Sequence, residues 1–392
     1  MFKKKGIKAG DSFNTVVVKC RLYDYDTILL NKHFGCSRFV YNEALSYNKE
    51  LYKKEKRSLS YVDLAKRLPS LKNSKETSFL KEVDATSLQQ AIQDYSQSLK
   101  MFIMRKGGYP TFRKKYLNDT FRIINIKSNN SCSIRFDSGK LKLGKFGWVK
   151  TKPNMTIPDG EIQSATVKRT KTGKVFATVC IRRSEKIPEL PKTGVETAID
   201  LGIKNYITLL NGEQIPKPDF IKQYEIRLDK MERSLSRKHH NSKNYIKEKK
   251  RLASVCEKET NRLMDFQHKL SLSIVRDYDF IAVEHLNVKA MLKDNKIPNK
   301  KKVHRLISEL GWYRFISMLE YKSKRYGKEF VRVNTYYPSS QTCSHCGYKN
   351  TETKDLSVRE WTCPQCETKH DRDINACQNI YNEGKRILSE KQ

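Results

Sequence analysis

Residues 343–376 read CSHCGYKNTETKDLSVREWTCPQCETKHDRDINA, and the spacing of the cysteines in this stretch predicts a metal site. Two Cys-x-x-Cys pairs, Cys343 with Cys346 and Cys363 with Cys366, are separated by sixteen residues. Each pair can give two thiolates to one ion, and two pairs complete the tetrahedron that structural zinc prefers. Two disulfides or a redox pair are competing interpretations, which scattered cysteines in a chain without a secretory signal disfavour. We therefore predict a structural zinc site.

Three carboxylates occupy positions that suit a second, catalytic metal site. Asp200 and Glu284 each end a short apolar run of the kind that forms a buried strand, and Asp373 follows the second cysteine pair. A carboxylate at the end of a buried strand costs free energy unless a partner such as a divalent cation compensates it. Phosphodiester hydrolysis needs such acids from separate elements, converging on two ions about 4 Å apart. Oxygen ligands favour Mg²⁺ or Mn²⁺, so we predict such ions at these acids.

Each acid taken alone also has a simpler structural interpretation. Asp200 could be a turn residue before Gly202, Glu284 could pair with a lysine, and Asp373 could cap a helix that starts near Ile374. Their order along the chain favours the metal site: strand and Asp, long basic helical region, strand and Glu, cysteine pairs, then Asp on a helix.

The net charge predicts a polyanionic partner. The chain carries 78 Lys and Arg against 43 Asp and Glu, a net charge of +35. A compact protein with this charge repels itself unless an anion neutralises it, which favours nucleic acid over a merely lysine-rich surface. No stretch approaches the roughly 18 apolar residues of a membrane span. The amino terminus lacks a secretory pattern and the remaining cysteines are scattered, which together predict a cytoplasmic protein.

The first half of the chain has the pattern of a small β-barrel with a helical insert. Residues 14–21 alternate as a strand does, and a helical stretch follows until the turn at Gly107-Gly108. Beyond it, short strands surround the turns at 137–139 and 171–173, each predicting a hairpin. Antiparallel strands of this length are typical of a small barrel.

The second half of the chain has a mixed α/β pattern. Residues 197–201 and 206–210 are predicted strands, and 221–277 predict two long antiparallel helices joined by a basic turn. A single helix is predicted for 306–326 and a further strand for 330–336.

Several segments together resemble the TnpB (OrfB) family of transposable elements and the related type V CRISPR effectors. The resemblance covers nearly the whole chain. Its most specific segments are Ala198-Ile-Asp-Leu-Gly-Ile-Lys204, Val283-Glu-His-Leu-Asn-Val-Lys289, Pro338-Ser-Ser-Gln-Thr-Cys-Ser-His-Cys-Gly347, Trp361-Thr-Cys-Pro-Gln-Cys366 and His370-Asp-Arg-Asp-Ile-Asn-Ala376, together with Phe34-Gly-Cys-Ser-Arg-Phe-Val-Tyr-Asn42 and Tyr109-Pro-Thr-Phe-Arg-Lys-Lys115.

The resemblance implies an α/β plus β-barrel fold. An RNase H-like RuvC nuclease domain would carry an inserted four-cysteine zinc ribbon and follow a small barrel, or wedge, domain with a helical insert. The implied boundaries are 1–22 and 107–186 for the barrel, 23–106 for the helical recognition domain, 191–342 and 367–392 for the nuclease domain, and 343–366 for the ribbon.

The same resemblance implies the roles of the site residues. Asp200, Glu284 and Asp373 would be the three catalytic, magnesium-binding acids, and the four cysteines would bind zinc. Asp371 is the alternative third acid, because both aspartates lie in the third motif. The family usually has an acid after the second-motif glutamate, where this chain has His285.

An RNA-guided DNA endonuclease is the function that the resemblance implies. Its partners would be a guide RNA from the transposon end and double-stranded target DNA with a short adjacent motif, with base pairing supplying specificity. Three alternatives share these sequence features: a strand-transfer transposase with the same acids, a CRISPR-type effector, and a non-cleaving RNA-guided DNA binder. No protein partner follows from the sequence.

Overall fold

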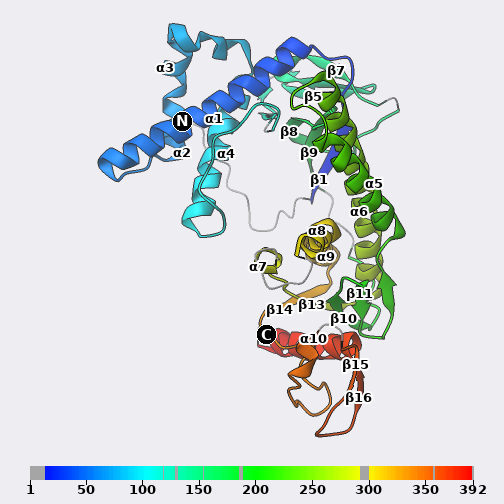
Figure 1. Cartoon of the computed structure of the whole chain (residues 1–392). Coiled ribbons are helices and arrows are strands. Elements are labelled where there is room, and N and C mark those ends of the chain that lie inside the picture. The colour runs from blue at the N-terminus through cyan, green and yellow to red at the C-terminus, as the bar shows by residue number, and fades with distance from the viewer. Residues whose placement is uncertain are drawn as a thin grey trace. The chain divides into compact units, whose positions relative to one another are not determined.

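The structure is a computed structural model of the 392-residue chain. It describes residues 14–117, 119–128, 131–152, 154–184, 189–291, 300–355 and 358–390. The chain divides into two compact units, residues 1–186 and 187–392 (Figure 1). Both units contain helices and strands, which confirms the predicted mixed α/β character.

The first unit combines a set of helices with short antiparallel strands. Its elements are β1 (Asn14–Arg21), α1 (Thr27–Glu55), α2 (Tyr61–Lys66), α3 (Leu68–Asn73), the 3-10 helix η1 (Lys75–Glu82), α4 (Ala85–Ile103), β2 (Thr120–Ile124), β3 (Lys127–Ser128), β4 (Ser131–Cys132), β5 (Ile134–Asp137), β6 (Lys140–Leu143), the 3-10 helix η2 (Gly144–Phe146), β7 (Trp148–Lys150), β8 (Glu161–Arg169) and β9 (Val175–Arg183).

The main sheet of this unit has the strand order β1-β9-β8-β2, all antiparallel. The first strand lies along the last, with Asn14 opposite Arg183 and Arg21 opposite Phe176, so the helices α1–α4 are inserted between strands of one sheet. Both predicted hairpins are confirmed, as β5-β6 and β8-β9. The remaining strands form the separate sheets β5-β6-β7 and β3-β4, and closure into a barrel stays a prediction.

Two capped helices form the frame of the inserted segment. The Asp26 carboxylate accepts backbone N–H groups at the start of α1, and Asp84 does the same for α4. Leu88, Ile92 and Tyr95 of α4 are buried in a core shared with α1. The insert therefore has a hydrophobic core of its own.

The second unit is built on a mixed sheet with helices on both faces. Its elements are β10 (Glu196–Leu201), β11 (Asn205–Leu209), β12 (Gln214–Pro216), α5 (Asp219–Ser236), α6 (Lys243–Asp277), β13 (Phe280–Glu284), α7 (Val288–Met291), α8 (Lys300–Leu310), α9 (Trp312–Tyr326), β14 (Glu329–Val333), the 3-10 helix η3 (Glu352–Lys354), β15 (Glu360–Thr362), β16 (Lys369–Asp371) and α10 (Arg372–Ser389). Among the described helices, none has the length and apolar character needed to cross a membrane.

The central sheet of the second unit has the order β12-β11-β10-β13-β14. The pairs among β10, β11 and β12 are antiparallel, whereas β10, β13 and β14 run parallel. Alternate residues of β13 enter different cores: Ile281 and Val283 pack with α6 and α9, whereas Phe280 and Ala282 pack with α10. At Gly384 of α10 an added Cβ would lie 2.6 Å from the Cβ of Ala282, so only glycine allows this close approach.

Two predicted elements of this unit were wrong in extent. The helix expected over 306–326 is two helices, because Gly311 adopts the left-handed conformation with a φ of 61° and ends α8. The strand expected over 330–336 ends at Val333, because Asn334 starts a turn in which its carbonyl accepts the N–H of Tyr337. The predicted long helical pair is confirmed as α5 and α6, which lie side by side (Figure 1).

Candidate active site and metal centre

The three predicted acids lie in one pocket of the second unit. Asp200 comes from β10, Glu284 from the end of β13 and Asp373 from the first turn of α10. All three line a pocket of about 570 Å³. The sequence therefore named three residues, far apart in the chain, that the fold brings together.

Strand register explains how two of these acids meet. In the parallel pair β10-β13, Ile199 lies opposite Val283, so Asp200 and Glu284 follow at the same carboxyl-terminal edge of the sheet. Helix α10 packs on β10, β13 and β14 and presents Asp373 from its first turn. An edge where parallel strands end is a common place for a site in an α/β sheet.

Burial makes two of these acids, Asp200 and Glu284, reluctant to ionise. The pKa of Asp200 rises to about 7, first because the carboxyl is buried and then because Glu284 and Asp373 are close. The pKa of Glu284 also rises to about 7 through burial. Carboxylate oxygens that converge on one pocket, two of them on groups whose pKa is raised by burial, are the kind of donor set that binds a hard divalent cation.

The two aspartates of the third motif, Asp371 and Asp373, have different roles in the structure. Asp371 is the N-cap of α10: its carboxylate accepts the N–H groups of Asp373 at 2.9 Å and Ile374 at 3.0 Å. Asp373 lines the pocket and forms an ion pair with Arg359 at 3.3 Å. The capping role considered for Asp373 thus belongs to Asp371.

Cations in the same pocket were missed by the sequence analysis. Lys349, Arg359 and Arg372 all line it, and the charge of Arg372 opposes the rise in the pKa of Asp200. Arg372 is largely buried, and its guanidinium donates to the carbonyl of Asp355 at 3.2 Å. Its place between the two aspartates of the third motif was the only available signal, because nothing in the local pattern shows which way this side chain points.

A hydrogen-bond network connects the pocket to the first cysteine pair. The hydroxyl of Ser339 donates to Glu284 at 3.3 Å, and the carbonyl of Ser339 accepts from the amide of Asn379 at 2.8 Å. One turn earlier on α10, the Asn375 amide oxygen accepts the N–H of Ser344 at 2.9 Å and its NH₂ group donates to Thr342 at 2.8 Å. Helix α10 thereby holds residues 339–344 in place.

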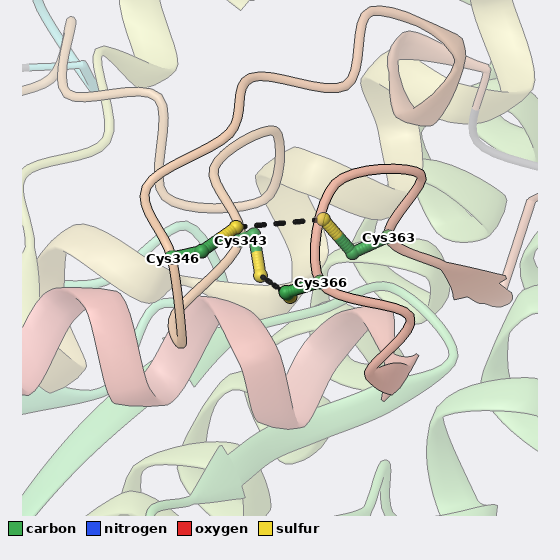
Figure 2. Close-up of side chains that lie close together, drawn as sticks. All are labelled: Cys343, Cys346, Cys363 and Cys366. Atoms are coloured by element: carbon green, nitrogen blue, oxygen red, sulfur yellow. Dashed lines mark hydrogen bonds between the residues drawn. The ribbon is translucent and has the colours of Figure 1, made fainter.

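The four predicted zinc ligands also come together. The sulfur atoms of Cys343, Cys346, Cys363 and Cys366 all lie within 4.8 Å of one another and converge on a common point (Figure 2). Two of the separations, Cys343 to Cys366 and Cys346 to Cys363, are 3.6 Å. A tetrahedron with Zn–S bonds of about 2.3 Å has edges of about 3.8 Å, so the cluster fits a zinc ion.

His370 supports this cluster and was not assigned a role from the sequence. Its Nε2 lies 3.0 Å from the sulfur of Cys343, and its ring packs on Trp361 with centroids 4.8 Å apart. Burial lowers the pKa of His370, which favours the neutral imidazole. A neutral N–H beside a thiolate is the kind of outer partner that orients metal ligands.

These features define a class of protein: an α/β protein with an acidic pocket beside a four-cysteine cluster. Three family models match the chain: "Helix-turn-helix domain" over residues 26–57, "Probable transposase" over 178–295 and "Cas12f1-like, TNB domain" over 312–380. The chain belongs to the TnpB (OrfB) family.

Full-length relatives support this membership. A protein of Streptomyces pristinaespiralis named "Putative RNA-guided DNA endonuclease" is 34% identical over 92% of this chain and 87% of its own length. InsQ of Escherichia coli K12, with the same description, is 26% identical over 92% of this chain and 89% of its own. Among solved structures, the Cas12f1–sgRNA–target DNA complex matches with a TM-score of 0.57 over 90% of this chain and 82% of that one. That likeness, at 15% identity, concerns the fold.

Proposed function

We propose that this protein is an RNA-guided DNA endonuclease that cuts DNA by phosphodiester hydrolysis in the pocket of Asp200, Glu284 and Asp373. The observation that carries the proposal is the convergence of these acids from β10, β13 and α10 on one pocket. Relatives that match nearly the whole chain bear the name of this activity.

The chemistry would depend on two Mg²⁺ or Mn²⁺ ions held by these three acids. Such ions, when bound, activate the attacking water and stabilise the leaving oxygen. Two residues of the chain support such a metal site. Ser339 orients Glu284 through a hydrogen bond from its hydroxyl, and the positive charge of Arg372 offsets part of the repulsion around Asp200. Lys349 and Arg359 add positive charge to the pocket wall, where an anionic phosphate would enter.

The partners in this proposal are a guide RNA from the transposon end and target DNA with a short adjacent motif. The net charge of +35 suits a protein that holds two polyanions. Base pairing between guide and target would supply the sequence specificity, and the protein would bind backbone shape.

The predicted domain organisation belongs to the same proposal. The order β12-β11-β10-β13-β14, with an antiparallel part followed by a parallel part, supports an RNase H-like RuvC domain formed by 191–342 and 367–392. Residues 343–366 would be its zinc ribbon. The pairing of β1 with β9 supports a wedge domain of 1–22 and 107–186 that carries the helical insert 23–106.

The decisive experiment compares Asp200→Ala with Asp265→Ala, which removes an exposed aspartate on α6 that pairs with Lys269. Protein loaded with the RNA that co-purifies with it is given a plasmid matched to that RNA and Mg²⁺. We expect Asp200→Ala to abolish cutting while RNA binding persists, and Asp265→Ala to cut normally. Undiminished cutting by Asp200→Ala would overturn the proposed site, and joining of transposon ends without guide-matched cutting would favour a strand-transfer transposase.

A further inference from the structure

Tyr336 is the most exposed large apolar or aromatic side chain among the described residues. It is 87% exposed, and it lines the same pocket as Asp200, Glu284 and Asp373. A tyrosine ring exposed to water does not gain the free energy that burial of its apolar surface would provide. Single exposed aromatic residues are nevertheless common on protein surfaces. Its place beside a nuclease pocket makes the exposure informative.

The loop that carries Tyr336 is held on both sides. The side-chain oxygen of Asn334 accepts the N–H of Tyr336 at 3.0 Å, and its carbonyl accepts the N–H of Tyr337 at 3.0 Å. Thr335 is tied to His285 by a hydrogen bond from its hydroxyl to the His285 carbonyl and by a 2.9 Å contact with Nδ1 of that ring. These hydrogen bonds anchor the backbone that carries the Tyr336 ring beside the pocket.

The pocket wall offers a different chemistry from its acids. Ile203, Leu286 and Met291 line it together with the aromatic side chains of Tyr336 and Trp312. A polynucleotide presents a charged phosphate and an apolar base face at every residue, so it needs both kinds of surface. Stacking of a base on an aromatic ring contributes about 1–3 kcal/mol and tolerates any sequence.

We propose that Tyr336 forms a nucleobase-binding subsite beside the acid pocket, where it stacks on an unpaired base of the strand being cut. The stacked base fixes the register of the strand, and so determines which phosphodiester reaches Asp200, Glu284 and Asp373. A base inside a duplex is already stacked on both faces, so only an unpaired base has a face for this ring. This inference rests on the proposed nuclease function of the pocket.

Binding can be tested without any cutting, in the full chain carrying Asp200→Ala. The probe is a short single-stranded DNA with one 2-aminopurine, whose fluorescence is quenched when it stacks on an aromatic ring. The variants are Tyr336→Ala, Tyr336→Phe and, as a control, Tyr313→Ala, which removes another exposed tyrosine, 68% exposed on α9. Because Tyr336 is exposed, we expect all three to keep the melting temperature of the parent.

We expect Tyr336→Ala to lose the quenching and to bind about 5- to 140-fold more weakly. Tyr336→Phe should keep both, because it keeps the ring, and Tyr313→Ala should behave as the parent. With Asp200 intact, Tyr336→Ala should scatter the cut positions on guide-matched DNA, as read by sequencing the product ends.

Unchanged quenching and unchanged cut positions in Tyr336→Ala would overturn the subsite, as would an equal loss of quenching in Tyr313→Ala. The two proposals fail separately. Quenching that depends on Tyr336, in a protein that never cuts, would refute the nuclease and keep the base contact. Cutting that depends on Asp200, with cut positions that do not change in Tyr336→Ala, would support the nuclease and refute the base contact.

Discussion

The carboxylate of Asp371 accepts the backbone N–H of Asp373 at 2.9 Å, so the first aspartate of this pair caps the helix that carries the second. The two residues are therefore not interchangeable. We expect Asp373→Ala to abolish cutting of guide-matched DNA with little loss of stability, because it removes a pocket carboxylate. Asp371→Ala should lower the free energy of unfolding by about 1 kcal/mol and keep appreciable activity.

Asp371→Asn is the control for this prediction, since asparagine also caps helices well. It should restore most of the stability in urea unfolding and leave cutting intact. Loss of activity in Asp371→Asn with full activity in Asp373→Ala would move the third acid two residues back.

The cysteine cluster predicts a stoichiometric zinc ion. Elemental analysis of the purified protein should find about one zinc per chain, because four thiolates complete its coordination. Cys363→Ser should release the metal and lower the melting temperature, since folding energy resides in the metal bonds. Cys256→Ser, at an exposed cysteine of α6, should keep both. Full stability in strong chelator with no bound zinc would contradict the site.

Asn379 predicts a link between stability and the orientation of Glu284. Its amide donates to the carbonyls of Ser339 at 2.8 Å and Thr342 at 2.6 Å, and it is buried. Asn379→Ala leaves these carbonyls without that donor, so we expect a loss of about 1–3 kcal/mol in urea unfolding. We also expect more Mg²⁺ to be needed for half-maximal cutting, because Ser339 would no longer hold Glu284 firmly.

Asn382→Ala is the matched control for Asn379→Ala, because Asn382 is exposed one turn further along α10. It should change neither the unfolding free energy nor the Mg²⁺ requirement. An Asn379→Ala protein with the Mg²⁺ requirement of the parent would show that Ser339 does not orient Glu284 in solution.

The sequence predicted correctly those helices and strands that are determined by neighbouring residues in the chain. The glycine turn at 171–173 between two predicted strands identified a hairpin, and the structure buries Val175, Ala177, Val179 and Ile181 of the second strand. The apolar period runs on through Leu310 and Trp312, so the break at Gly311 was hidden until its left-handed backbone was known. The predicted end of the last strand, at residue 336, was wrong for a similar reason, because the alternating pattern of residues continues past Val333 into a turn.

The acids and the cysteines were predictable because their chemistry constrains spacing and strand position. The groups around them were not, because their roles depend on contacts between distant segments. Ser339 reaches Glu284 across 55 positions, and Asn375 reaches Thr342 across 33. No local pattern in the sequence encodes such pairs, whereas a carboxylate at the end of an apolar run is visible at once.

The tip of the α5-α6 pair predicts a salt-sensitive nucleic-acid contact. No residue between Leu228 and Val255 in these two helices is buried, so the tip, residues 237–250, contributes no buried side chain to the core of this unit. Its cations include Arg237, Lys238, Lys247 and Lys250. Replacing all four by alanine should weaken RNA binding and reduce the slope of log K against log salt by roughly one for each phosphate that these cations neutralise.

The control for the tip replaces four exposed lysines of the first unit, Lys49, Lys53, Lys54 and Lys66. It makes the same change in net charge at another place. If the tip contacts RNA phosphates, its slope should fall further than that of the control. Equal slopes in the two variants would mean that the tip is a solvated face contributing only general charge.

Lys322 predicts a pH dependence of stability that is separate from the acid pocket. It is buried between α6 and α9, and its ammonium donates to the carbonyl of His268 at 2.6 Å and the hydroxyl of Ser271 at 2.8 Å. Burial lowers the pKa of Lys322 to about 8, below its unfolded value near 10.4. Between these two values the unfolded chain binds more protons than the folded one.

Stability must therefore rise with pH across that window, because deprotonation removes the cost of the buried charge. We expect the free energy of unfolding of the parent, measured relative to Lys322→Met, to increase from about pH 8 to about pH 10. Lys324→Met, at an exposed lysine of the same helix, should show no such relative change. Taking the difference between parent and variant cancels the titration of all other groups. A flat difference over this range would show that Lys322 keeps an ordinary pKa in the folded protein.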